Sequence, residues 1–102
     1  MSTGLLFKMT AKPGSGKELA HLLVESSKLF DDNPDCLGYV VGEANDVPDV
    51  VWVLELWTTR QAHDDAIKAP GVQALVGQAF QIMDGMPEQV ELTPVGAKAL
   101  LS

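Results

Sequence analysis

A carboxylate and a histidine suited to acid–base chemistry stand close together in an apolar part of the sequence. Glu55 lies between Val53 and Trp57 on one face of an expected strand, and His63 lies on the expected helix that follows. A carboxylate in an apolar wall needs a polar partner or has a raised pKa, and a histidine can act as a general base near neutral pH. These residue types predict a site in which His63 is the base and Glu55 orients or deprotonates a phenol.

Each of these side chains also has a structural interpretation. Glu55 could form a buried ion pair with Lys8 or Arg60, or a contact between subunits. His63 could be a partly buried histidine that is hydrogen-bonded to the backbone or to water. Trp57, at the end of its strand, could be the flat wall of a pocket for an aromatic ligand or could fill the core.

Four apolar or aromatic side chains are candidates for contact with a substrate. Phe7 and Met9 share one face of the first expected strand, Tyr39 lies in the second, and Phe80 belongs to the apolar face of the last expected helix. For Tyr39, packing in the core is the alternative.

The sequence lacks the common motifs of metal, nucleotide and serine-hydrolase sites. It contains no H-E-x-x-H, no G-x-S-x-G and no G-x-G-x-x-G. Residues 13–17, PGSGK, are similar to the end of a P-loop, but the first glycine is missing and Glu18 replaces the Ser or Thr, so a strand-to-helix turn explains them. We expect His21, Asp64 and Asp65 to be solvated surface groups, and we expect no metal site.

Composition argues against several partners. The 102-residue chain has a formal net charge of −7, with 14 acidic residues against 7 basic ones. So few cations disfavour binding to nucleic acid. No apolar run is long enough to cross a membrane, and the N-terminus lacks the layout of a signal peptide. The single cysteine, Cys36, cannot form an internal disulfide, which fits a reducing cytoplasm. We expect one domain, residues 1–102.

The order of expected elements is strand, helix, strand, strand, helix pair, strand. This order is typical of an α+β, ferredoxin-like split βαβ fold, in which helices cover one face of an antiparallel four-stranded sheet. The predicted ranges are strand 3–12, helix 16–31, strand 36–44, strand 50–57, a short helix from Thr58 or Thr59 to Ala69, a helix that begins at Pro70, strand 88–95 and a tail from 96 to 102.

The third expected strand, residues 50–57, is apolar on both faces. Trp52, Leu54 and Leu56 alternate with Val53 and Trp57, and Glu55 is the one charged residue among them. One face can meet the helices, and the other face then needs a second partner. The sheet of a second copy of the chain is the simplest one, so the pattern predicts a homodimer.

Several segments resemble the antibiotic biosynthesis monooxygenase family of dimeric α+β barrel proteins, and the last one resembles its quinol monooxygenase subgroup. The sharpest feature is the E-x-W of Glu55 and Trp57 before an alanine-containing helix. The segments are KPGSGKELAHLL, NPDCLGYVV, VVWVLELWTTRQAHDDAIKAPGVQALV and GMPEQVELTPVG. The resemblance implies a homodimer in which two sheets form a central barrel, and an apolar pocket between sheet and helices in each subunit.

The resemblance also implies a chemistry. Characterised members of the family oxidise phenolic, quinol or polyketide substrates with O2, without a metal or a flavin, because a deprotonated electron-rich aromatic can itself donate an electron to O2. Trp57 matches the family tryptophan. The chain departs from the family at Val53, Ala66 and Gly71, where members often carry Asn, His and His.

The sequence leaves more than one function open. The first is a monooxygenase without a cofactor that acts on a hydroxylated aromatic, a quinol or a polyketide-like substrate. The alternative is a non-catalytic dimeric module that binds a small apolar molecule or serves as a scaffold. An isomerase would need only the acid–base groups and no O2.

Overall fold

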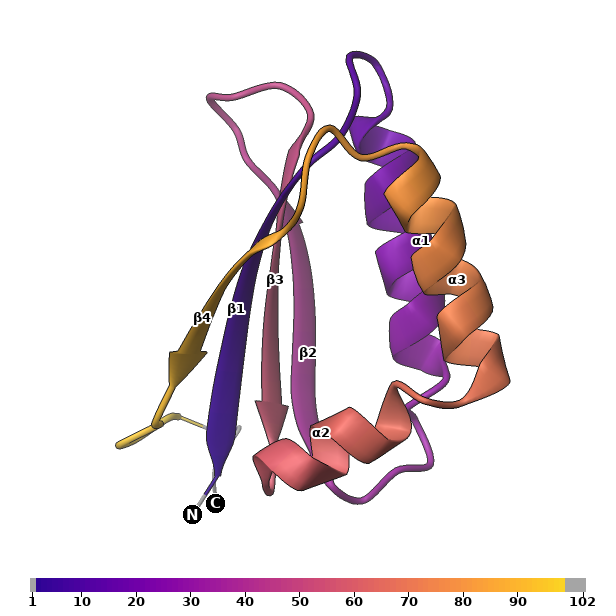
Figure 1. Cartoon of the computed structure of the whole chain (residues 1–102). Coiled ribbons are helices and arrows are strands. Elements are labelled where there is room, and N and C mark those ends of the chain that lie inside the picture. Colours follow the sequence, from indigo (N-terminus) through magenta and orange to yellow (C-terminus); the bar gives the residue numbers. More distant parts are fainter. Residues whose placement is uncertain (1, 99–102) are drawn as a thin grey trace.

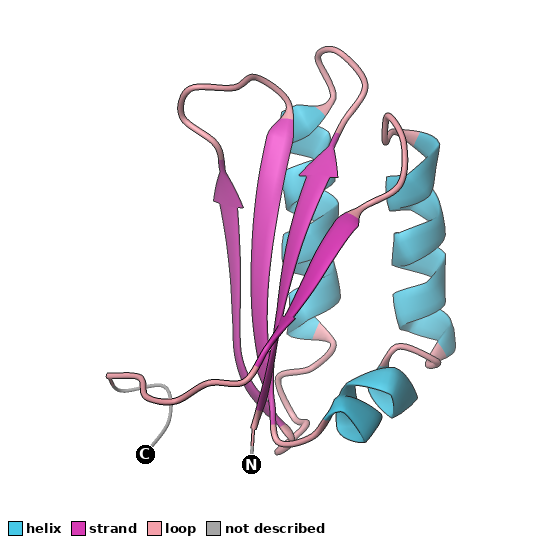
Figure 2. Ribbon diagram, turned by 60° about the vertical axis from the view of Figure 1, so that its left-hand side comes forward, coloured by secondary structure: helices cyan, strands magenta, loops and turns pink. Residues whose placement is uncertain are grey.

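The computed structural model describes residues 2–98 and places them in two layers, a sheet and helices that cover one of its faces (Figure 1). The strands form one antiparallel sheet in the order β2-β3-β1-β4 (Figure 2). The predicted α+β, ferredoxin-like fold with a four-stranded antiparallel sheet is therefore confirmed. The elements are β1 (Thr3–Thr10), α1 (Gly16–Lys28), β2 (Cys36–Glu43), β3 (Val50–Trp57), α2 (Arg60–Ala66), α3 (Pro70–Gln81) and β4 (Glu88–Leu92).

Several elements are shorter than the sequence predicts. At the end of α1, the N–H groups of Leu29 and Phe30 donate to carbonyls three residues back, so the chain continues in turns rather than to residue 31. Strand β4 ends at Leu92, two residues before Pro94, which has no N–H to donate to a sheet. Helix α2 ends at Ala66 instead of residue 69. The predicted tail, residues 96–102, lies partly outside the described residues.

The turn between β1 and α1 is closed by a carboxylate from the same chain. Asp49 accepts hydrogen bonds from the N–H groups of Gly14 at 3.0 Å and Gly16 at 2.9 Å. A Cβ atom at Gly16 would lie 2.8 Å from the Cα atom of Asp49, so glycine is needed for this close approach. These two N–H groups are thus occupied by Asp49, which supports the interpretation of residues 13–17 as a turn.

The two faces of the sheet have different surroundings. On the helix side, Val51, Val53 and Trp57 of β3 are completely buried. On the opposite side, Trp52 of the same strand is 40% exposed. An apolar row crosses this open face in register, from β2 to β4: Val40, Leu54, Leu6 and Val90. The predicted two-sided apolar character of β3 is therefore present, and the described chain covers only one side.

Candidate active site

Helix α2 places His63 against the inner face of the sheet. The side-chain oxygen of Thr59 accepts a hydrogen bond from the N–H of Ala62 at 3.0 Å and so caps the start of the helix. His63 follows one turn later and is only 5% exposed. Its ring lies edge-on to the indole of Trp57, with 5.6 Å between the ring centroids. The histidine is thereby fixed between the helix and the end of β3.

Glu55 is buried beside this histidine. Its Oε1 atom accepts a hydrogen bond from Trp57 Nε1 at 3.0 Å and lies 3.9 Å from Nε2 of His63. Burial raises the pKa of Glu55, while the indole hydrogen bond and the nearby histidine lower it to a smaller extent. The carboxyl group of Glu55 therefore keeps its proton to a higher pH than a solvated glutamate does.

The ion-pair partners predicted for Glu55 were wrong. Lys8 pairs instead with Glu88, at 3.8 Å between Nζ and Oε2. Arg60 pairs with Asp64, at 3.0 Å from Nε to Oδ1, and with Glu91 of β4. Both cations find acids nearer to solvent, because burial of a long cationic side chain beside Glu55 would cost more than these surface pairs.

Asp64 was predicted to be a solvated surface acid, and the structure gives it a more specific contact. Its Oδ1 atom lies 2.9 Å from Nδ1 of His63. The hydrogen bonds with His63 and Arg60 hold the pKa of Asp64 below its usual value. A continuous series of polar contacts therefore runs from Trp57 through Glu55, His63 and Asp64 to Arg60.

A cavity of about 380 Å³ opens beside this series, between the sheet and the three helices. A volume of this size is typical of a small-molecule pocket. Six of the seven predicted site residues line it, together with Arg60 and Asp64. The six are Phe7, Met9, Tyr39, Glu55, His63 and Phe80; the remaining walls come from Leu23, Ser26, Phe30, Ile67, Val72, Gln73, Val76, Met86, Pro87 and Gln89.

Of the two places expected for Trp57, the wall of the pocket and the core, the structure shows the core. Trp57 is completely buried and does not belong to the residues that line the cavity. Phe30 packs edge-on against its indole, with 5.2 Å between centroids. Trp57 thus contacts Glu55 and His63 from the core and not from the cavity. Among the described residues, Phe30 and Tyr39 are the aromatic side chains that line this part of the cavity.

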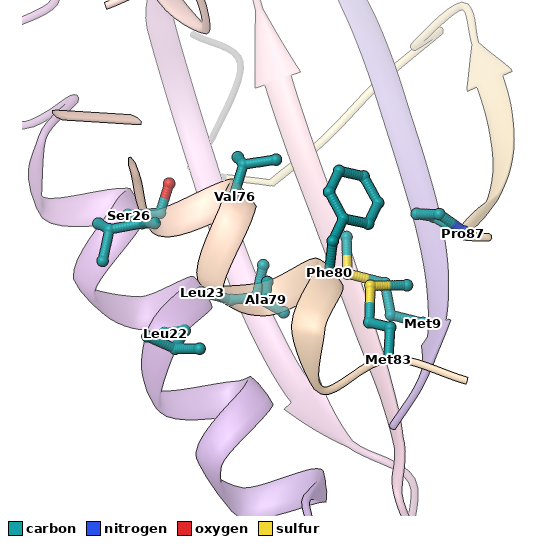
Figure 3. A pocket seen from close by; sticks show the side chains of 10 residues that line it. Met9, Leu22, Leu23, Ser26, Val76, Ala79, Phe80, Met83 and Pro87 are labelled. Atoms are coloured by element: carbon teal, nitrogen blue, oxygen red, sulfur yellow. The ribbon is translucent and has the colours of Figure 1, made fainter. Parts of the chain in front are cut away.

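A smaller apolar pocket of about 50 Å³ adjoins the cavity between α1 and α3. Figure 3 shows Leu22, Leu23 and Ser26 on α1 facing Val76, Ala79 and Phe80 on α3, with Met9 and Met83 toward the sheet and Pro87 at the side. Met9 and Phe80 belong to both spaces. The flexible methionines and the small Ala79 leave room here for part of an apolar ligand.

None of the three positions where the chain departs from the family pattern lines the cavity. Val53 is fully buried in the core. Ala66 and Gly71 border a separate, open groove of about 620 Å³ that also includes Leu29 and Lys68. In the described part of the chain, the acid–base groups of the cavity are therefore supplied by Glu55, His63 and Asp64.

Residues 2–98 contain no group of three or more His, Cys, Asp or Glu side chains arranged to hold a metal ion. Within the same residues, none of the helices has both the length and the apolar character needed to cross a membrane.

Comparison with known proteins identifies the family. The sequence model of the antibiotic biosynthesis monooxygenases matches residues 3–78, which is most of the chain. The chain belongs to the antibiotic biosynthesis monooxygenase family. No curated protein matches it significantly in sequence.

Several solved structures have the same fold as this chain. A crystal structure from Chloroflexus aurantiacus J-10-fl, provisionally named an antibiotic biosynthesis monooxygenase, is 31% identical, with a TM-score of 0.88 over 98% of this chain and 99% of that one. SnoaB, a cofactor-independent oxygenase from Streptomyces nogalater, is 14% identical, with a TM-score of 0.80 over 96% and 97%. Rv0793 from Mycobacterium tuberculosis is 16% identical, with a TM-score of 0.83 over 97% and 100%. At these last two identities the likeness shows the fold alone.

Proposed function

We propose that this member of the antibiotic biosynthesis monooxygenase family oxidises a hydroxylated aromatic, quinol or polyketide-like substrate with O2 and without a cofactor. The observation that carries the proposal is the buried Glu55–His63 pair at the wall of the 380 Å³ cavity. Membership of the antibiotic biosynthesis monooxygenase family supports the reaction type. The segment GMPEQVELTPVG supports the quinol monooxygenase subgroup as part of the same proposal.

The residues of the cavity have distinct roles in the proposed reaction. Nε2 of His63 accepts the proton of a substrate hydroxyl, and Glu55, fixed by the Trp57 indole, orients the histidine and stabilises its charged form. Phe7 and Tyr39 pack against the aromatic rings of the substrate. Removal of the proton makes the bound aromatic rich in electrons, and the apolar walls keep water away from it.

Deprotonation prepares the substrate to reduce O2 directly. The phenolate transfers one electron to O2, and the radical pair combines to form a carbon–oxygen bond. The O–O bond then breaks as hydrogen is lost from that carbon. One oxygen atom enters the product as the second carbonyl of a quinone. The other leaves as water, whose two hydrogens come from the substrate C–H and O–H.

The charges around the cavity favour an uncharged substrate. Its only arginine among the described lining residues, Arg60, is already paired with Asp64 and Glu91. An anionic ligand would meet Glu55 and Asp64 without a free cation to balance it. Neutral phenols and quinols are therefore the expected substrates, and their carboxylated analogues are expected to bind more weakly.

A homodimer is part of this proposal. The open face of the sheet carries the apolar row Val40, Leu54, Leu6 and Val90, and a second copy of this face would cover it. We expect light scattering to give about twice the mass of the chain, 10.9 kDa. A monomeric mass at micromolar concentration would contradict this part of the proposal. The free thiol of Cys36 supports a cytoplasmic location.

A non-catalytic binding protein is the second candidate. It is favoured by the absence of the family Asn and His at Val53, Ala66 and Gly71, none of which lines the cavity. In that case the apolar cavity would still bind a small aromatic molecule, and the Glu55–His63 pair would serve stability alone.

Oxygen consumption and ligand-induced thermal shift distinguish the candidates. We propose to assay purified protein with a panel of dihydroxynaphthalenes and anthrones. Oxygen uptake that depends on protein and substrate, with a quinone as product, supports the monooxygenase. A thermal shift without oxygen uptake supports the binding protein. Conversion to an isomer without oxygen uptake would identify the isomerase. If the panel gives no thermal shift and no turnover, the proposed substrate class is contradicted.

A further inference from the structure

The carboxylate of Asp64 contacts the side of the His63 ring that faces away from Glu55. Oδ1 of Asp64 lies 2.9 Å from Nδ1 of His63, and the opposite ring nitrogen, Nε2, lies 3.9 Å from Oε1 of Glu55. The imidazole is thus placed between two carboxyl groups. One of them, Glu55, is buried, and the other has a side chain that is 41% exposed.

Asp64 is itself held in position. The same Oδ1 atom accepts a hydrogen bond from Nε of Arg60 at 3.0 Å, one turn earlier on α2. A second nitrogen of Arg60 donates to Glu91 on β4, at the far edge of the sheet. Arg60 therefore links the helix that carries His63 to a strand that lies thirty-one positions further along the chain. This link fixes the direction in which the Asp64 carboxylate points.

The chemistry of the two groups determines where the proton lies. An ionised carboxylate can only accept hydrogen bonds, and the pairing with Arg60 favours the ionised form of Asp64. The atom that contacts Asp64, Nδ1, must then carry a proton. In the neutral ring this leaves Nε2 without one, so the basic nitrogen is the one that lies beside Glu55 and the cavity.

We propose that Asp64 is a positioning residue that fixes the Nδ1–H tautomer of His63 and leaves Nε2 as the nitrogen that accepts a proton at the cavity. The tautomer follows from the contacts alone, and only its use in turnover rests on the proposed function.

The tautomer can be measured without any assay of activity. In protein labelled with 15N-histidine, long-range couplings to the ring protons show which nitrogen is protonated in the neutral ring. His21 is the other histidine, and a His21→Gln variant assigns the two sets of signals. We expect the neutral ring of His63 to be protonated on Nδ1. Protonation on Nε2 in the unmodified protein would overturn the proposal, whether or not any variant folds.

Variants of neighbouring acids test the cause. Asp64→Ala should move the His63 proton largely to Nε2, because Nδ1 loses its acceptor. Asp65→Ala is the matched control, since Asp65 lies next along α2 and bonds to Gln61 and Lys68 rather than to His63. Its spectrum should keep the Nδ1–H pattern. An unchanged tautomer in Asp64→Ala would show that another group fixes the ring.

Kinetics test the use of this arrangement in turnover. Asp64→Ala should lower kcat by about 10–100-fold, the range found for carboxylates that orient metal-bound histidines, with little change in KM. Asp65→Ala should change neither constant. An inactive unmodified protein would contradict the proposed function while the spectra still decide the tautomer. Equal kcat in Asp64→Ala and the unmodified protein would contradict the role in turnover.

Discussion

Replacement of Trp57 by Phe removes the hydrogen-bond donor of the buried Glu55 carboxylate while it keeps an aromatic ring. The Nε1–H of the indole donates to Oε1 of Glu55 at 3.0 Å, and the indole is completely shielded from solvent. A hydrogen bond to a charged group contributes about 1.5–3 kcal/mol, against about 1 kcal/mol for a neutral one. The smaller ring also leaves space in the core, at a cost of about 1–2 kcal/mol.

These two costs depend differently on pH. At about pH 8, where the charged form of Glu55 has its greatest weight, Trp57→Phe should lower the free energy of unfolding by about 3–4 kcal/mol. At about pH 4, where the raised pKa keeps Glu55 protonated in the folded protein, the loss should be about 1–2 kcal/mol smaller. Urea denaturation at one fixed protein concentration measures both values.

A matched control separates packing from hydrogen bonding. Phe30→Leu disturbs the edge-on contact with the Trp57 ring, at 5.2 Å between centroids, and leaves the indole N–H in place. Its destabilisation should be the same at both pH values. An equal loss of free energy at the two pH values in Trp57→Phe would show that the indole contributes only packing, and would contradict the prediction.

Three further predictions concern pH, backbone and assembly. Because burial raises the folded-state pKa of Glu55, the folded protein keeps this proton above the unfolded value of 4.5. The protein should then lose about 1.4 kcal/mol of stability per pH unit across that window. This loss should be missing in Glu55→Gln, and parallel pH curves for the two proteins would contradict it. Gly16→Ala should cost more than 1 kcal/mol in urea unfolding, because its Cβ would lie 2.8 Å from Cα of Asp49. At Gly77 an added Cβ would have no described atom within 4 Å, so Gly77→Ala should raise the free energy of unfolding by about 1 kcal/mol through helix propensity. A larger loss of stability in Gly77→Ala than in Gly16→Ala would contradict both expectations. Leu54→Lys should halve the mass measured by light scattering, and an unchanged mass would place the interface elsewhere.

The strand pattern made much of the fold predictable. The alternation of Val51, Val53 and Trp57 with Trp52 and Leu54 indicated two apolar faces, and β3 has the predicted bounds. Helix ends were harder to predict, because the last turns of α1 and α2 depend on local hydrogen bonds rather than on periodicity. Strands β1 and β4 end at Thr10 and Leu92, earlier than the predicted residues 12 and 95.

The site was predictable where side-chain direction follows from the period of a strand or helix. Alternation placed Phe7 and Met9 on the same face of the first strand, and both line the cavity together with Tyr39 of the second strand. The depth of Trp57 was not predictable, because burial depends on Phe30 and on the helix that covers it. The contact of Asp64 with His63 was also missed. The Arg60–Asp64 spacing of four residues was the available signal for it.

Oxygen uptake by His63→Ala, compared with His21→Ala, tests the central role of the Glu55–His63 pair most directly. His21 lies on α1 with a side chain that is 70% exposed, so it controls for the loss of a histidine. With a substrate that the unmodified protein oxidises, we predict that His63→Ala lowers turnover by about 10²–10⁴-fold, the usual contribution of a general base, and that His21→Ala does not. Equal oxygen uptake by His63→Ala and the unmodified protein would contradict the account.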